Sequence, residues 1–431
     1  MNVGMKQSSD RSSAFEPIQD LESDNLGRHL FARRLLRRVS TPDCSSAVGL
    51  YGGWGVGKTS ILNLMTIINQ EEKFPVPEKP KLEYIDVWPY EASGDLALPI
   101  LVHMRSLIGG APQENYSKSW RRIVGVLAQA GTDIALRKIL NLKLSEVKDY
   151  VGNLPDVSPD TINLRDLETL VDDIRGAQNA FCDLVQLASK AYQNRRIVFM
   201  IDNLDRCSPE NVVRLLESIK NFLYAPNCVW VFAMDAGVIA SYIDHKYEGT
   251  RMDGNSYLDK IVPEQYHIPP ISDQAINQLH KFLTTVRPIN VEQGSLPEVD
   301  IKKIPQLPEV LIPRRLLKTA HKFYEAYTGD LKTSVIADPQ LVFMLILLYN
   351  TWPAFYERFS SGKPEHLYGI LSNFSDQGTD KTLYIPLEEK FTNNRALKHF
   401  LHHCFIHQQD IKTVCTTLAG CMTWLHEVGL P

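Results

Sequence analysis

The chain has 431 residues, of which 44% are hydrophobic and 22% are charged, and its formal net charge is −4 at pH 7. The length predicts two or three domains of an ordinary globular protein. The small negative net charge excludes an overall electrostatic attraction of the chain to nucleic acid or anionic lipid. Seven cysteines occur without a C-x-x-C pair, which favours reduced thiols in a cytoplasmic protein over a disulfide framework.

The amino-terminal segment is polar and is followed by a helical pattern. Residues 1–23 are rich in serine and lack the apolar core of a signal peptide, so we expect a flexible tail and no secretion. No run of about eighteen apolar residues occurs in the chain, which argues against a membrane span. The next stretch, DNLGRHLFARRLLRRVS, predicts an amphipathic helix. Its polar side forms a solvated face, which we favour, or contacts nucleic acid or nucleotide phosphates through Arg33, Arg34, Arg37 and Arg38.

A glycine-rich segment behind a short apolar run carries the most specific motif. Gly52, four further residues and Gly57-Lys58-Thr59 match the phosphate-binding pattern G-x-x-x-x-G-K-[ST]. Glycines let backbone N–H groups approach a phosphate, the lysine reaches the β- and γ-phosphates, and the threonine hydroxyl binds Mg²⁺. We expect an exposed Lys58 side chain, a strand before the loop and a helix after it. The predicted nucleotide contacts are Gly52, Gly53, Trp54, Gly55, Val56, Gly57, Lys58, Thr59 and Ser60.

A strand and a long helical insertion are predicted next. LEYIDVW at 82–88 is typical of a strand, whereas residues from about 93 to 190 lack strand signals. Apolar residues recur at every third or fourth position between Leu164 and Val185, which indicates a helix. A helical insertion therefore separates the phosphate-binding loop from the second nucleotide motif.

The second nucleotide motif is RIVFMIDNLDRC at 196–207. Its apolar run predicts a buried parallel strand that ends in Asp202, where a carboxylate can hold Mg²⁺ across from Thr59. This Walker B pattern is specific when it follows a phosphate-binding loop. Another buried strand, CVWVFAMD, ends in Asp235, which either senses the γ-phosphate or caps the following loop.

Strands that alternate with helices predict an α/β fold with a parallel sheet and helices on both faces. We assign a P-loop core to 24–270 and a helical C-terminal domain to 271–431, because the strand signals stop after YHIPP. In the second domain, LVFMLILLY at 341–349 suits a buried helix. The nucleotide is expected at the carboxyl edge of the sheet.

Histidines near the carboxyl terminus are a weak candidate for a metal site. HFLHHCFIH places His399, His403 and His407 on one helical strip beside Cys404, and a His–His spacing of four can bind zinc. No cysteine pair or acidic third ligand accompanies them, so the strip fits an ordinary surface equally well.

The chain resembles KAP-type P-loop NTPases over roughly residues 24–325. The matching segments, in the order of that family, are GLYGGWGVGKTSILNLM, YIDVWPYEAS, VFMIDNLDRCSPENVVRLLESI, VFAMDAGVIASYI, YLDKIV with YHIPP, and IPRRLLKTAHKF. The resemblance implies membership of the AAA-like additional-strand division, ATP binding and, for bacterial members, a frequent link to phage exclusion or other antiviral defence. Some members carry membrane helices between the Walker motifs, but the insertion here lacks an apolar span.

The resemblance also implies roles for particular residues. The P-loop residues would hold the phosphates, and Thr59 and Asp202 would hold Mg²⁺. The family pattern further assigns an acidic-basic block, a sensor, and an arginine on a C-terminal helix that leans onto the nucleotide. These correspond to Asp205 with Arg206, to Asp235, and to Arg314.

One position departs from the family pattern. Asn203 stands where such proteins commonly carry a second acid after the Walker B aspartate, and an amide cannot accept a proton from water. Three explanations stay open: Asp205 or Glu91 serves as base, Asn203 only positions water, or hydrolysis is slow.

Together these patterns predict an ATPase switch that binds ATP and Mg²⁺. Catalysis would be positioning and charge stabilisation, with Lys58, Asp202, Asp205 and Arg314 as the catalytic residues. By resemblance, the switch serves antiviral defence with a separate effector protein, because the sequence shows no nuclease or other killing chemistry. A non-hydrolysing nucleotide-dependent scaffold and a DNA-engaging ATPase stay open, as does a homo-oligomer.

Overall fold

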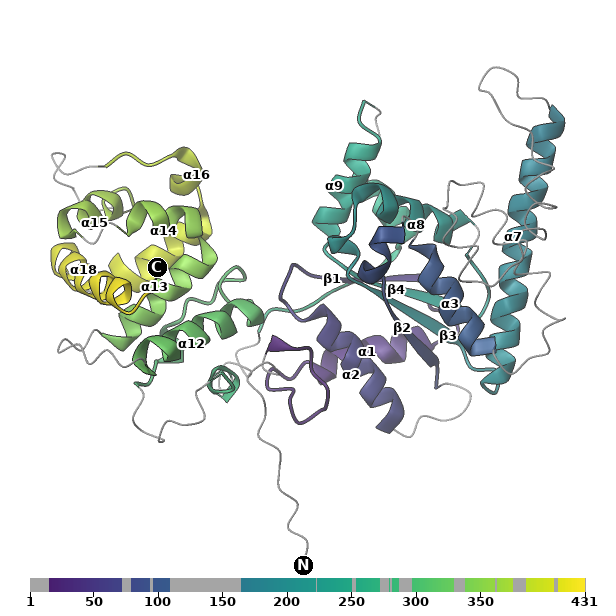
Figure 1. The fold of residues 1–431 in the computed structure, drawn as a ribbon, viewed down its shortest axis with the longest axis horizontal. Coiled ribbons are helices and arrows are strands. Elements are labelled where there is room, and N and C mark those ends of the chain that lie inside the picture. Colours follow the sequence, from purple (N-terminus) through teal and green to yellow (C-terminus); the bar gives the residue numbers. More distant parts are fainter. Residues whose placement is uncertain are drawn as a thin grey trace, which may run out of the picture.

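A parallel β-sheet forms the centre of one of two lobes in the computed structural model of the chain (Figure 1). The structure describes residues 15–71, 79–93, 96–108, 164–221, 223–249, 253–271, 279, 281–286, 297–328, 338–360, 363–374, 385–406 and 410–430. The described strands run in the order β2-β3-β4-β1-β5, and all neighbours are parallel. They are β1 (Ala47–Tyr51), β2 (Lys81–Asp86), β3 (Ile197–Asp202), β4 (Cys228–Met234) and β5 (Glu264–His267). The predicted α/β class is confirmed.

Both faces of the sheet are covered by helices, since successive strand residues point to opposite sides. Val48 and Leu50 belong to the face that packs against α1 (His29–Ser40) and α2 (Lys58–Glu71). Phe199 and Trp230, with ring centroids 4.7 Å apart, belong to the other face. That face packs against α3 (Ala97–Ile108), α7 (Leu164–Ala191), α8 (Pro209–Asn221), α9 (Ala236–Lys246) and α10 (Gly254–Ile261).

The helical insertion is described only at its two ends. Helix α3 follows a short 3₁₀ turn at Trp88–Ser93, and α7 leads back to β3. The helical pattern between Leu164 and Val185 is confirmed by α7, while residues 109–163 lie outside the described part. Among the described helices, none has both the length and the apolar character that crossing a membrane requires.

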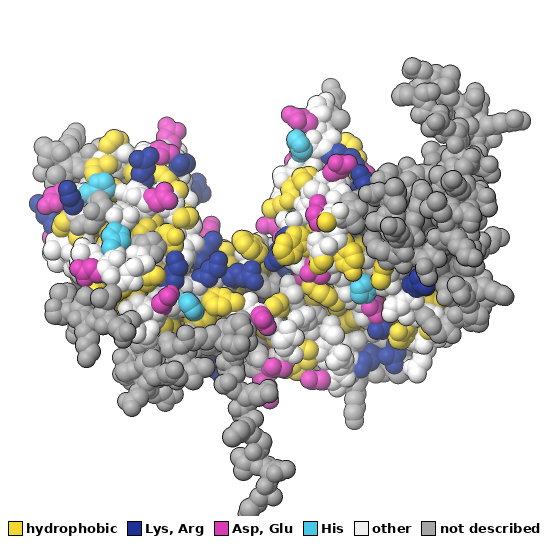
Figure 2. Space-filling model, viewed as in Figure 1, with side chains coloured by type: hydrophobic (Ala, Val, Ile, Leu, Met, Phe, Trp, Pro, Cys, Tyr) yellow, Lys and Arg dark blue, Asp and Glu magenta, His cyan; other side chains and the backbone are white. Residues whose placement is uncertain are grey.

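The second lobe is helical, and a hollow separates it from the sheet lobe on the face shown in Figure 2. Among the labelled helices of this lobe, α12 lies nearest to the sheet lobe (Figure 1). The helices are α12 (Pro313–Thr328), α13 (Pro339–Thr351), α14 (Pro353–Phe359), α15 (Pro364–Leu371), α16 (Glu389–Thr392), α17 (Arg395–Leu401) and α18 (Ile411–Glu427), with a π-helical turn at His402–Ile406. Proline at the first position starts several of them, because its missing N–H is not needed there.

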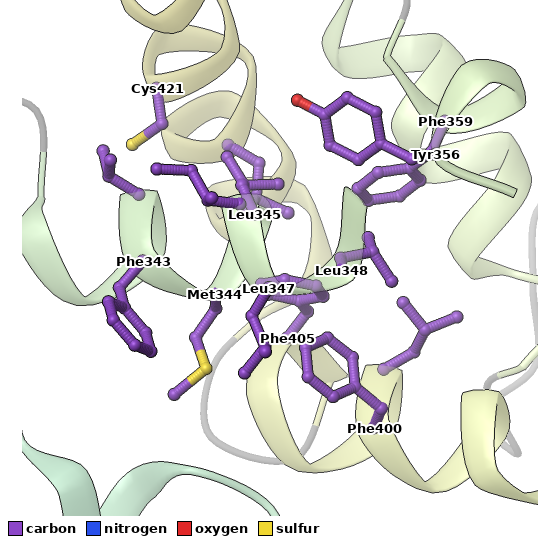
Figure 3. Packing of buried hydrophobic residues seen from close by; sticks show 14 of the residues in the cluster. Phe343, Met344, Leu345, Leu347, Leu348, Tyr356, Phe359, Phe400, Phe405 and Cys421 are labelled. Carbon is purple, nitrogen blue, oxygen red and sulfur yellow. The ribbon is translucent and has the colours of Figure 1, made fainter. Parts of the chain in front are cut away.

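Helix α13 lies in the middle of this lobe, as its uninterrupted apolar sequence predicts. Its residues from Val342 to Leu348 are all buried. Figure 3 shows Leu345, Leu347 and Leu348 packed among the aromatic side chains of neighbouring helices, including Tyr356 and Phe400. The lobe thus has a hydrophobic core of its own.

The expectation of a flexible tail is wrong for residues 15–23, which pack on the P-loop helix. The backbone N–H of Ile18 donates to Ser60 Oγ at 3.3 Å, and Asn63 Nδ2 donates to the Ile18 carbonyl at 3.0 Å. At the other end of the segment, Phe15 lies edge-on to His321 of α12, with 5.9 Å between ring centroids. The apolar residues of this segment follow neither a helical nor a strand period, so their burial leaves no pattern in the sequence.

Candidate functional site

A cavity of about 570 Å³ lies between the sheet lobe and the start of α12. Its walls are the amino-terminal segment, the phosphate-binding loop, the carboxyl end of β3 and the first turn of α12. Predicted site residues on its lining are Trp54, Gly55, Val56, Gly57, Lys58, Thr59, Ser60, Asp202, Asp205 and Arg314, joined by Asn203 and Arg206. They meet because the carboxyl ends of parallel strands share one edge of the sheet. Gly52, Gly53 and Asp235 are not on the lining.

The loop between β1 and α2 has a backbone that requires glycine at two positions. Gly55 has φ +84° and Gly57 has φ +103°, a region where a Cβ atom meets the backbone. The loop is also tied to the helical lobe, because the Arg314 N–H donates to the Gly55 carbonyl at 3.3 Å. Helix α2 begins at Lys58, so its amino-terminal N–H groups, which suit an anion, lie at the cavity.

Lys58 is buried, which corrects the expectation of an exposed side chain: only 8% of it is accessible. Its ammonium donates to the Gly52 carbonyl at 2.9 Å, to the Gly53 carbonyl at 3.3 Å and to Asp205 Oδ2 at 2.9 Å. An ammonium has three protons, so these contacts satisfy it fully. A phosphate that enters the loop therefore competes with Asp205 for Lys58.

Asp202 is the most deeply buried acid of the cavity, with 1% of its surface exposed. It accepts hydrogen bonds from Thr59 Oγ1 at 2.6 Å, from Tyr84 OH at 3.1 Å and from the Asn203 N–H at 2.9 Å. Burial raises the pKa of this carboxyl above its usual value, an effect that the hydrogen bonds oppose only in part. A perturbed acid in a cavity is typical of a functional site.

The hydroxyl of Thr59 and the carboxylate of Asp202 fit a Mg²⁺ ion that arrives with nucleotide phosphates, because Mg²⁺ takes hard oxygen ligands and keeps several waters. Tyr84 is a neighbour of this pair that the sequence alone did not indicate. Its strand lies beside β3 in parallel register, with Asp86 opposite Asp202, and this pairing brings the phenol to the carboxylate.

The two candidate bases differ in their surroundings. Glu91 binds the start of α8: its Oε1 accepts hydrogen bonds from the Ser208 N–H at 3.0 Å and from Asn211 Nδ2 at 3.1 Å. It does not line the cavity. Asp205 lies on the cavity and touches Lys58. Asn203 lines the cavity with φ 63°, a left-handed conformation that asparagine tolerates better than most residues.

The neighbouring arginines at the start of α12 point apart. Arg314 lines the cavity, and its guanidinium lies 5.7 Å from the centroid of the Trp54 ring. Arg315 donates instead to the backbone carbonyl of Glu309. Of the two arginines, Arg314 is therefore the one at the cavity, and its contact with a nucleotide stays a prediction.

Asp235 caps a helix. Its Oδ1 accepts from the N–H groups of Gly237 at 3.1 Å and Val238 at 3.4 Å, at the start of α9. Of the two interpretations that the sequence left open, these contacts support the cap. A sensor role for Asp235 stays a prediction.

The arginines of α1 do not form one free stripe. Arg38 donates through Nε and Nη2 to both carboxylate oxygens of Glu264, each at 2.7 Å, and also contacts Asp43. Arg34 and Arg37 are exposed. The Arg38–Glu264 pair joins α1 to β5 and thus has a structural role. Arg38 is therefore not available for the nucleic-acid contact that the sequence left open on α1.

The histidine strip gives no metal site within the described residues. The rings of His399 and His403 stack with centroids 6.3 Å apart, and Cys404 Sγ contacts Met344 Sδ. Nowhere in the described ranges do three His, Cys, Asp or Glu side chains gather closely enough to hold a metal ion. His407 lies outside these ranges.

Replacing Gly55 by alanine tests the contact between the loop and α12. A Cβ at this residue would lie 2.9 Å from Arg314 Cβ, on a backbone with φ +84°. We expect Gly55→Ala to reduce ATP affinity at least about tenfold, measured by calorimetry, because strain of roughly 1–2 kcal/mol adds to the clash. Gly53→Ala is the control, since its Cβ would meet nothing closer than Asp235 Oδ2 at 3.7 Å. Equal affinities of the two variants would contradict the expectation.

Comparison with known proteins adds two findings. The profile of the KAP family P-loop domain matches residues 28–409. The chain is also similar to the phage T7 exclusion protein of Escherichia coli (strain K12), with 21% identity over 263 residues. The aligned region covers 58% of this chain and 34% of that protein.

Proposed function

The chain belongs to the KAP family of P-loop NTPases, and from this premise we propose that it is a Mg²⁺-dependent ATPase switch. The observation that carries the proposal is the single cavity where Lys58, the Thr59–Asp202 pair and Arg314 meet. Three of these residues come from the sheet lobe and the last comes from α12, so one nucleotide can contact both lobes.

In this proposal, the phosphates of MgATP lie on the N–H groups of the loop and of the first turn of α2. Thr59 and Asp202 would hold the Mg²⁺ that arrives with the substrate, and Lys58 would move from Asp205 to the β- and γ-phosphates. The released Asp205 carboxylate then faces the γ-phosphate. Arg314 neutralises negative charge that develops there, so closure of α12 onto the loop follows the nucleotide state.

Asp205 is the proposed general base. Water attacks the γ-phosphorus, the bond from that phosphorus to its bridging oxygen breaks, ADP leaves, and Asp205 takes a proton of the water. In this assignment, Asp205 takes the role of the second acid, whose usual position in the family pattern is occupied here by Asn203. Asn203 can still hold the attacking water through its amide.

We place this switch in antiviral defence, as the NTPase component that acts with a separate effector protein in the cytoplasm. Support comes from the similarity to the phage T7 exclusion protein, whose name refers to phage exclusion. In this proposal, an effector protein or a homo-oligomer carries the downstream action.

Replacement of Asp205 by asparagine tests the mechanism. Asp205→Asn should lower Mg²⁺-dependent ATP turnover by at least about tenfold, or 1.4 kcal/mol of barrier, because the amide cannot take the proton. ATP affinity should be unchanged or higher, since the competitor for Lys58 loses its charge. Glu91→Gln is the matched control and should turn over near the parental rate. Loss of turnover in the Glu91 variant alone would show that the base is misassigned.

A non-hydrolysing scaffold is the second candidate, and the observation that favours it is Asn203 on the cavity lining. The same assay separates the two functions. A parent chain that binds MgATP tightly and releases no phosphate would be a scaffold.

A further inference from the structure

Exposed tryptophans and cations lie beside the nucleotide cavity and along α12. Figure 2 shows Lys and Arg side chains gathered over α12, beside hydrophobic side chains. The residues that form this surface, which we term the cleft strip, are Trp54, Trp88, Arg206, Arg314, Lys318 and Lys322. Trp54, Arg206 and Arg314 also line the nucleotide cavity, so the strip is continuous with it.

Each tryptophan of the cleft strip is exposed and has an arginine beside it. Trp54 is 68% exposed and Trp88 is 49% exposed, although large aromatic side chains are usually buried. The guanidinium of Arg314 lies 5.7 Å from the Trp54 centroid, and that of Arg206 lies 5.0 Å from the Trp88 centroid. An indole ring is a stacking platform for the base of a nucleotide, and a cation beside the ring can contact the phosphate of that nucleotide.

Among the described residues, the cations of the strip form no salt bridge, and Lys322 Nζ lies 4.4 Å from the centroid of the Tyr349 ring. Arg314, Lys318 and Lys322 are four residues apart on α12, so they follow one side of the helix over about 12 Å. None of the salt bridges among the described residues involves these three or Arg206. Arg38, Lys58 and Lys246, by contrast, each bind a carboxylate.

We propose that the cleft strip binds single-stranded nucleic acid, with bases stacked on Trp54 and Trp88 and phosphates along Arg314, Lys318 and Lys322. Lys318 and Lys322 extend beyond the nucleotide cavity, so the nucleotide alone does not account for them. An acidic protein segment would use the cations, whereas the two exposed indole rings favour bases. This partner goes beyond the ATPase switch, and sharing Trp54 and Arg314 gives it a route to the nucleotide.

The test is fluorescence anisotropy of a labelled oligothymidylate of about 20 nucleotides, titrated with the full chain without ATP at several salt concentrations. Lys318→Glu/Lys322→Glu should weaken binding at least about tenfold and flatten the salt dependence, because two phosphate contacts are lost. Trp88→Ala should weaken it at least about fivefold. The control Arg34→Glu/Arg37→Glu makes the same change in net charge on α1 and should bind as the parent does. Retained ATP binding shows that each variant is folded.

Three results would overturn the proposal. The parent could fail to bind the oligonucleotide even at low salt. The α1 pair could lose as much affinity as the α12 pair, which would assign the contact to overall charge or to α1. Trp88→Ala could bind as the parent does while polyglutamate displaces the oligonucleotide at equal charge concentration, which would assign the strip to an acidic protein partner. ATP binding is measured separately, so a failure of the proposed ATPase function is a distinct result.

Discussion

Lys58→Ala is expected to reduce ATP affinity by at least about a hundredfold and to abolish turnover. The ammonium is the only described side-chain cation in contact with the P-loop carbonyls, at 2.9 Å from Gly52 and 3.3 Å from Gly53. Without it, the β- and γ-phosphates lose their closest positive charge in a site largely screened from water. Calorimetric titration with ATP and a phosphate-release assay measure the two effects. An affinity close to that of the parent would refute the P-loop assignment.

The same substitution should also destabilise the fold, and this effect can be separated from binding. Asp205 is 12% exposed and loses its cation in Lys58→Ala, which costs about 1–3 kcal/mol. Lys58→Ala/Asp205→Ala removes both charges, so its thermal unfolding midpoint should lie above that of the single variant. ATP binding should stay lost in the double variant. Recovery of both stability and binding would mean that Lys58 acts on the fold and not on the nucleotide.

The elements that the sequence predicts best are those whose signal is local. Strands β3 and β4 are buried on both faces, so each leaves an uninterrupted apolar run. The phosphate-binding loop is predictable because its pattern is local: Gly57, a fixed glycine of the pattern, has a left-handed backbone that requires glycine. Gly55 has such a backbone too, although the pattern leaves that position free. Asp202 follows from the same logic, because it ends a buried parallel strand.

The features that could not be predicted from the sequence depend on contacts between segments that are distant along the chain. The Lys58–Asp205 pair joins residues 147 positions apart, and no local pattern reports that a lysine in a glycine loop is buried. Tyr84 reaches Asp202 only because β2 and β3 pair in one particular register. Residues 15–23 resemble a solvated tail in composition, yet Ile18 binds α2 through its backbone, which composition does not reveal.

Arg314→Ala should uncouple nucleotide binding from the movement of α12. Arg314 lines the cavity with its guanidinium near Trp54, whereas its bond to the Gly55 carbonyl is made by the backbone N–H and is kept in the alanine variant. Loss of this side chain should therefore lower turnover by about a hundredfold or more while it spares much of the ATP affinity. Arg315→Ala is the matched control, because that side chain contacts the Glu309 carbonyl instead.

Small-angle X-ray scattering of the parent, Arg314→Ala and Arg315→Ala at saturating MgATP tests the two-lobe switch most directly. ATP occupancy is established for each variant beforehand by calorimetry. We expect ATP to reduce the radius of gyration of the parent and of Arg315→Ala and to leave that of Arg314→Ala unchanged. Full compaction of Arg314→Ala, or loss of compaction in Arg315→Ala alone, would contradict the coupling that we assign to Arg314.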